Sequence, residues 1–260
     1  MPPSLVTPAI VLRSRPFGES DRIVSFLTAD FGKITGIAKG AMRSRKRFVN
    51  SLEPFAQVNL HFQDRAQSGL AFIVAADLVV GYRHLARSLE TISHAAYLVE
   101  ITDGLVGERE ESMAVYHHLR DGLRRLEEHG TSFRLLIAFE LKLLRLVGYQ
   151  PVLDNCKRCA HEFPDPEITL WYFSPADGGV LCNSCASVRR EALPLGAKAI
   201  EILTALQAEP NNLPSSLSLP MSVIKEMRAA IEFFIQFHMV RQIKSAAFLQ
   251  QFSPAFSATN

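Results

Sequence analysis

The stretch AQVNLHF, residues 56–62, decides the fold of the N-terminal part of the chain. Its apolar side chains Val58, Leu60 and Phe62 alternate with polar ones, which is typical of a β-strand with one buried and one solvent-exposed face. Similar short segments lie on both sides of it, each bounded by residues that favour turns. We therefore predict strands over residues 9–13, 22–27, 33–38, 56–62 and 70–75.

No helical segment separates these five strands, so a small closed antiparallel barrel is favoured over a parallel sheet. The five-stranded OB-fold is the economical prediction, and it commonly binds nucleic acids. An SH3-like barrel is the structural alternative.

The segment 31–52, FGKITGIAKGAMRSRKRFVNSL, contains six cations and no acid. Residues 33–39 alternate as a strand does, whereas residues 40–47 have no apolar period and predict a mobile basic loop. Clustered cations repel one another unless an anion neutralises them, and a polyphosphate backbone does so while it releases its own counterions. We predict a phosphate-binding surface for nucleic acid, with a merely solvated loop as the alternative. The six cations are Lys33, Lys39, Arg43, Arg45, Lys46 and Arg47.

Composition limits the possible classes of protein. The 260 residues suffice for one large domain or for two to three small ones, and 48% apolar residues is ordinary for a globular protein. The formal charge of +2 is uneven, because residues 1–80 hold ten Lys and Arg against six Asp and Glu. We find no signal peptide and no apolar run long enough for a membrane helix, so we predict a cytoplasmic protein with no membrane partner.

After residue 81 the apolar period changes to that of helices. Ser88 can cap a helix that ends at Gly107, and two further helices are predicted from Ser112 to about Glu128 and from Ser132 to Val147. The third of these helices is apolar almost all round and should be central, with Glu140 in need of a partner. Two further helices are predicted over residues 197–207 and from Pro220 onward, separated by a linker over residues 209–218.

Four cysteines occur, as CKRC at residues 156–159 and CNSC at residues 182–185. Two such pairs can each chelate from one tight turn, and four thiolates complete a tetrahedral shell around zinc. The segment between the pairs suits a small hairpin. Because protein ligands fill all four positions, we predict a structural Zn²⁺; an iron–sulfur cluster or a redox dithiol would use the same ligand type. The predicted ligands are Cys156, Cys159, Cys182 and Cys185.

Together these segments predict an α+β protein in five parts. An OB-fold barrel, residues 1–80, is followed by an all-α domain formed by residues 81–150 and 191–249. A zinc module, residues 151–190, is inserted into the helical domain, and residues 250–260 form a flexible tail.

Common catalytic motifs are missing from the sequence. It contains no GxxxxGK[ST], HExxH or GxSxG pattern. The acid pairs Glu19/Asp21 and Glu110/Glu111 could hold a catalytic magnesium ion, but adjacent surface acids are ordinary. We therefore predict a binding protein and not an enzyme.

The order of these parts resembles a known family. The run VLRSRPFGESDRIVSFLTADFGKITGIAKGAMRSRKRF, followed by LEPFAQVNLHF, is similar to the opening barrel of the RecO family of bacterial recombination mediators. The later GYQPVLDNCKRCA, FSPADGGVLCNSC and QIKSAAFLQ resemble the same family, so the similarity runs nearly end to end.

The resemblance implies an OB-fold that binds single- and double-stranded DNA, a helical domain and a zinc module. It also implies nucleoid-associated roles in DNA repair: annealing complementary strands and, with the partner RecR, helping RecA onto DNA covered by single-strand-binding protein. By position, it adds two arginines to the six cations above. The implied DNA contacts are Arg13, Arg15, Lys33, Lys39, Arg43, Arg45, Lys46 and Arg47.

Two functions of other classes stay open at this point. A zinc-ribbon RNA-binding or transcription-associated factor would bind base- or RNA-specifically, whereas a mediator must hold backbone without reading sequence. A zinc-stabilised scaffold would instead use the basic loop to contact an acidic protein.

Overall fold

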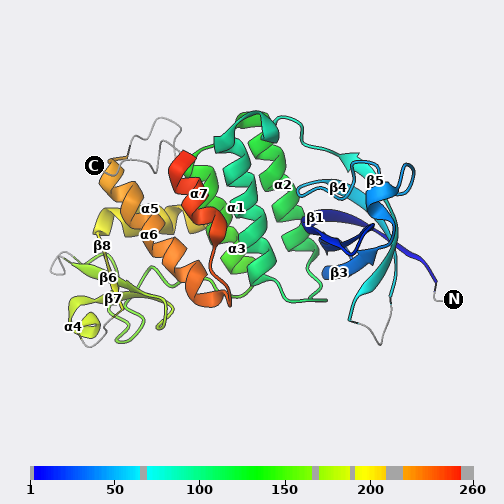
Figure 1. Ribbon diagram of the computed structural model, residues 1–260. Coiled ribbons are helices and arrows are strands. Elements are labelled where there is room, and N and C mark those ends of the chain that lie inside the picture. Colours follow the sequence, from blue (N-terminus) through cyan, green and yellow to red (C-terminus); the bar gives the residue numbers. More distant parts are fainter. Residues whose placement is uncertain (1–2, 65–68, 166–169, 188–190, 209–218, 253–260) are drawn as a thin grey trace. The chain divides into compact units, whose positions relative to one another are not determined.

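A computed structural model describes residues 3–64, 69–165, 170–187, 191–208 and 219–252. The chain divides into two compact units, Met1–Gly130 and Thr131–Asn260, whose elements are labelled in Figure 1. The first unit contains the barrel together with helices α1 and α2. The finer five-part division made from the sequence stays a prediction.

The barrel of the first unit is closed, with the strand order β1-β2-β3-β5-β4. All its neighbouring strands are antiparallel except β3 and β5, which are parallel. This five-stranded closed arrangement confirms the predicted OB-like barrel. The strands are β1 (Leu5–Phe17), β2 (Asp21–Thr28), β3 (Lys33–Ala38), β4 (Gln57–Gln63) and β5 (Ala71–Val80).

Strand β1 is much longer than the predicted residues 9–13. Its first half pairs with β4 and its second half with β2, and the register shifts between Val11 and Arg13. Such a bulge bends a strand, which lets β1 serve both neighbours. The bend also carries β1 through Pro16 to Phe17, so the hairpin turn is shorter than the sequence suggested.

Alternating side chains fill the interior of the barrel. The predicted inward residues of β4, Val58, Leu60 and Phe62, are fully buried, as are Ile34 and Ala38 of β3. The period-two pattern therefore identified the buried face of β4, and the burial of β3 is consistent with the alternation predicted there.

The predicted cap Ser88 is confirmed, and the residues where the next two helices were predicted to start are serine caps as well. In the first unit, Ser88 begins α1 (Leu89–Leu105) and Ser112 begins α2 (Met113–His129). In the second unit, Ser132 begins α3 (Phe133–Leu146). Each hydroxyl accepts a hydrogen bond from a backbone N–H in the first turn, which satisfies one otherwise unpaired donor.

Helices α3, α5 and α6 pack together in the second unit. Glu140 of α3 is completely buried, and its carboxylate pairs with Arg228 of α6, which supplies the partner that the sequence required. The later helices are α5 (Ala197–Ala208), α6 (Met221–His238) and α7 (Lys244–Phe252).

The cysteine-containing module forms a three-stranded sheet of order β7-β6-β8, with the short helix α4 between β7 and β8 in the chain. Phe173 of this sheet meets Phe234 of α6 edge to face, with ring centroids 5.4 Å apart, so the module shares a core with the helices. Its elements are β6 (Trp171–Ser174), β7 (Gly179–Cys182), α4 (Asn183–Ala186) and β8 (Leu193–Leu195).

Several details differ from the sequence predictions. Leu89 and Met113, the first residues of α1 and α2, are apolar yet 57% and 54% exposed. Residues 250–252, predicted as tail, belong to α7. The predicted linker 209–218 and the rest of the tail lie outside the described residues. No helix in the described ranges is long and apolar enough to cross a membrane.

Candidate nucleic-acid interface and candidate metal centre

The basic loop after β3 is anchored to the β1–β2 hairpin. The backbone N–H of Gly40 donates to Asp21 Oδ1 at 2.8 Å, and that of Met42 donates to the Ser20 carbonyl oxygen at 2.9 Å. Residues Ala41–Arg43 form a single 3-10 turn. The expectation of a mobile loop without local structure is therefore revised: its backbone is held at the hairpin, while its cationic side chains point outward.

Four of the predicted DNA contacts form an unpaired group on this loop. Lys39, Arg43, Arg45 and Lys46 are all exposed. Among the described residues, no carboxylate lies within ion-pair distance of any of them. Exposed cations without acidic neighbours are free to bind anions.

Arg47 is exposed but engaged within the loop. Its Nη2 donates to the Lys39 carbonyl oxygen at 2.8 Å, and its guanidinium carbon lies 5.0 Å from the centre of the Phe48 ring. The backbone carbonyl of Arg47 also accepts from the N–H of Ala76 on β5. Arg47 thus braces the loop against the barrel.

Lys33 stands apart from the loop cations. Its side chain is nearly buried, and Nζ donates to the Asp103 carbonyl oxygen at 2.7 Å and lies 3.4 Å from Asp103 Oδ1. The cause is that residues 107–110 cover this face of β3, where the N–H of Arg109 donates to the Lys33 carbonyl oxygen. The structure thus places the Lys33 ammonium group against Asp103 in the interior of the unit, away from the exposed loop cations, and its DNA contact stays a prediction.

Arg13 and Arg15 leave β1 on its exposed side. Arg13 Nε lies 3.5 Å from Asp103 Oδ2, so Asp103 has a cation on each carboxylate oxygen. Arg15 is exposed and, in the described part of the chain, has no ion pair. Phe17, two residues further, is 51% exposed at the hairpin, whereas Phe48 is 6% exposed and packs in the barrel.

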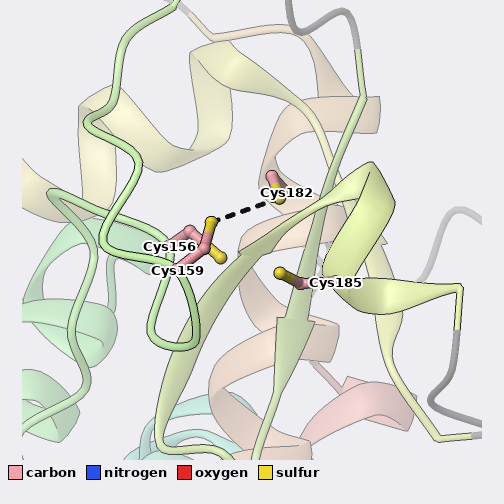
Figure 2. A group of neighbouring side chains, drawn as sticks. All are labelled: Cys156, Cys159, Cys182 and Cys185. Carbon is pink, nitrogen blue, oxygen red and sulfur yellow. Dashed lines mark hydrogen bonds between the residues drawn. The ribbon is translucent and has the colours of Figure 1, made fainter.

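The two cysteine pairs come together in the second unit, as Figure 2 shows. Cys156 and Cys159 lie on a turn, Cys182 ends β7 and Cys185 lies on α4. The turn is held to the hairpin because the N–H of Lys157 donates to the Val180 carbonyl oxygen at 2.9 Å. Gly179 permits this approach, since a Cβ there would lie 2.2 Å from the Val152 carbonyl oxygen.

The sulfur geometry fits a tetrahedral metal. All four Sγ atoms lie within 4.8 Å of one another, and Cys159 Sγ is 3.8 Å from Cys182 Sγ (Figure 2). A tetrahedral site with Zn–S bonds of about 2.3 Å requires sulfur separations of about 3.8 Å. All four cysteines are free of disulfides. This is the only cluster of three or more His, Cys, Asp or Glu ligands within the described ranges.

The thiols differ in acidity. Burial acts to raise the pKa of Cys156, but backbone N–H groups at Cys182, Cys159 and Arg158 outweigh it and lower that pKa to about 6. Burial and then hydrogen bonds with the other thiols raise the pKa of Cys185 to about 12. One thiolate thus suppresses ionisation of its neighbours, and a cation is needed to hold four thiolates together.

Other candidate ligands are excluded by their contacts. His161 is exposed and pairs with Asp165, outside the sulfur cluster. The acid pairs considered for magnesium are used locally, since Asp21 accepts from Gly40 and Glu110 accepts from the N–H of Gly107.

Comparisons with known proteins agree with this arrangement. A family model described as "Recombination protein O N terminal" matches residues 1–82, and one described as "Recombination protein O C terminal" matches residues 86–247. This chain belongs to the RecO family. The DNA repair protein RecO of Syntrophus aciditrophicus is 32% identical over 247 residues, which cover 94% of this chain and 95% of that protein. The DNA repair protein RecO of Anaeromyxobacter sp. (strain K) is 33% identical, with 96% and 97% covered.

Among the features of this RecO family protein that sequence reasoning missed are the partners of its buried charges. Asp103 and Arg228 lie 70 and 88 residues from Lys33 and Glu140, and no local pattern announces either pairing. The available signal was a charge on an apolar face: Arg228 interrupts the apolar period of α6 as Glu140 interrupts that of α3.

Proposed function

We propose that this protein is a non-enzymatic DNA-binding recombination mediator in DNA repair. One observation carries the proposal: four exposed cations that have no acidic partner among the residues the structure describes gather on an anchored loop of the OB-like barrel, namely Lys39, Arg43, Arg45 and Lys46. Arg15 extends this group along the neighbouring hairpin. We assign phosphate contacts to these five residues, and bracing roles to Arg13, Arg47 and Lys33.

Such a surface suits the binding of both single- and double-stranded DNA. Phosphate contacts from long, separate side chains hold the backbone without reading its sequence. Neutralising phosphates also lowers the repulsion between two complementary strands, so the same surface promotes their annealing. This step uses no ATP and no catalytic residue.

Membership of the RecO family supports a proposal about the partners with which the mediator acts. We propose that the protein acts with RecR, at DNA covered by single-strand-binding protein, and assists RecA loading indirectly. We also propose that the four cysteines hold one structural Zn²⁺. With four protein ligands the ion would have no open position for chemistry.

Strand annealing tests the proposal. Complementary labelled oligonucleotides are mixed with wild-type protein or with the variant Arg43→Glu/Arg45→Glu/Lys46→Glu, and the annealing rate is followed by fluorescence quenching. Arg47 is left unchanged because it braces the loop. We expect the rate to fall about tenfold or more, because three phosphate contacts become repulsive.

The matched control places the same charge change elsewhere in the same unit. Arg83, Arg87 and Arg125 are exposed and lie outside the loop, so Arg83→Glu/Arg87→Glu/Arg125→Glu should anneal at nearly the wild-type rate. If the loop variant anneals at the wild-type rate but no longer binds an acidic protein partner, the loop contacts protein and not DNA.

A further inference from the structure

A pocket of about 400 Å³ opens beside the basic loop. Residues 41–53 form most of its wall, and Arg22 of β2 completes it. Phe48 and Leu52 form an apolar floor that continues into the barrel core, whereas Met42 and Val49 stand half-exposed. The pocket therefore has an apolar floor and open walls that polar and apolar side chains share.

Polar groups are fixed at the wall of this pocket. Arg22 Nη1 donates to Ser14 Oγ at 3.1 Å and to Glu53 Oε1 at 2.8 Å, so its guanidinium plane is held in one orientation. Arg45 and Asn50 also line the pocket. A nucleobase has flat apolar faces and an edge of hydrogen-bond donors and acceptors, so a pocket that combines an apolar floor with polar groups on its walls matches it.

The position of the pocket suits a base whose backbone lies on the loop. Arg45 lines the pocket itself, and Arg43 and Lys46 are its neighbours in the chain, both exposed. A phosphate bound by these cations is attached to a base that needs to reach only the adjacent wall. No such opening is required to bind a phosphate alone.

We propose that this pocket accepts one unstacked base of single-stranded DNA. The proposal deepens the function proposed above and rests on it, because the loop cations must hold the backbone. A base in a duplex is paired and stacked and cannot enter, so the pocket gives single strands an advantage that the cations alone do not. Contact through apolar faces tolerates all four bases.

The test compares an ordinary single-stranded oligonucleotide with an abasic one of equal length, which carries the same phosphates and no bases. Binding of both is measured for the wild type and for Met42→Ala/Val49→Ala. Both substitutions are at half-exposed positions and change no charge. We expect the wild type to bind the ordinary strand about fivefold more tightly, and the double variant to lose that preference.

Phe17→Ala is the matched control, because Phe17 is an equally exposed apolar residue outside the pocket. This variant should keep the wild-type preference for the ordinary strand. Equal binding of the ordinary and the abasic strand by the wild type would contradict the proposal that the pocket binds a base. A preference for the ordinary strand that survives Met42→Ala/Val49→Ala would also contradict the proposal. Loss of that preference in Phe17→Ala would contradict it too, and would place the base on the hairpin.

The two proposals fail in different ways. If the wild type binds ordinary and abasic strands equally, and the loop charge reversal weakens both, then the phosphate surface stands and only the pocket is wrong. If the charge reversal leaves both affinities unchanged, the phosphate surface is wrong and the pocket falls with it.

Discussion

Asp103 forms ion pairs with two cations that lie on β-strands. It is 5% exposed, with Lys33 and Arg13 each near one of its carboxylate oxygens. Removing one partner of a nearly buried ion pair leaves a poorly compensated charge, which usually costs about 3–5 kcal/mol. Because Arg13 stays beside Asp103, we expect Lys33→Met to lower the free energy of unfolding by about 2 kcal/mol. Chemical denaturation measures this.

Lys39→Met is the control for that change, since Lys39 follows the same strand and is exposed. Its effect on the free energy of unfolding should stay within about 0.5 kcal/mol, while its DNA affinity should fall. The opposite pattern, with Lys33→Met stable but weak in DNA binding, would restore Lys33 as a phosphate contact.

Glu232 gives the second unit a pH-dependent stability. Burial raises the pKa of this carboxyl group, Glu140 adds to the effect, and Arg228 opposes it. The folded state therefore binds this proton more tightly than the unfolded state, so the contribution is present below the unfolded pKa and is lost as pH rises through the folded pKa. We expect Glu232→Gln to remove this loss.

Chemical denaturation of the wild type and of Glu232→Gln at pH 5 and at pH 7.5 tests the direction in which the free energy of unfolding changes with pH. The wild type should lose more stability than the variant between the two values. An equal loss of stability in both proteins would mean that the raised pKa of Glu232 is not the cause of the pH dependence.

At the residue scale, local chemistry predicted well and distant partners did not. The Ser88 cap and the helix starts at Ser112 and Ser132 were predictable because a helix start depends on a few neighbouring residues. The alternation of β3 correctly placed Lys33 on its outer face, but it carried no information that residues 107–110 cover that face.

The four-cysteine module is the element that the proposed zinc ion would stabilise. Its sheet contributes Phe173 to a contact with α6, so loosening the four cysteines should also loosen the helices. We expect a chelator to lower the free energy of unfolding by about 4 kcal/mol, the value for a site kept at a thousand times its Kd. Elemental analysis should find about one zinc per chain before chelation.

Cys182→Ser separates metal loss from other effects of the chelator. This variant should purify with little zinc, unfold more easily, and show no further change with chelator. A wild-type protein that is folded, active and free of zinc would contradict a structural metal.

At the element scale, the sequence predicted strands and helices where one face is apolar. The bounds of β3 agree with the prediction, since Gly32 and Lys39 end its pattern clearly. The length of β1 was missed because its register shift breaks the period. β8 has only three residues and α7 only nine, too few for a periodic signal to stand out.

At the scale of the whole molecule, the account rests on an uneven distribution of charge. The chain carries a net charge of only +2, yet four cations on one anchored loop have no acidic partner among the described residues. The cysteine spacing predicted the four-cysteine cluster because two short turns fix it locally, whereas the pocket proposed for a base depends on how residues 41–53 fold back on the barrel.

The most direct measurement is the salt dependence of single-stranded DNA binding. Each phosphate contact adds about 0.7 to the slope of log affinity against log salt. We predict a steep slope for the wild type, a slope smaller by about 2 for Arg43→Glu/Arg45→Glu/Lys46→Glu, and no change for Arg83→Glu/Arg87→Glu/Arg125→Glu. An unchanged slope and affinity in the loop variant would contradict the account and place the DNA site elsewhere on the molecule.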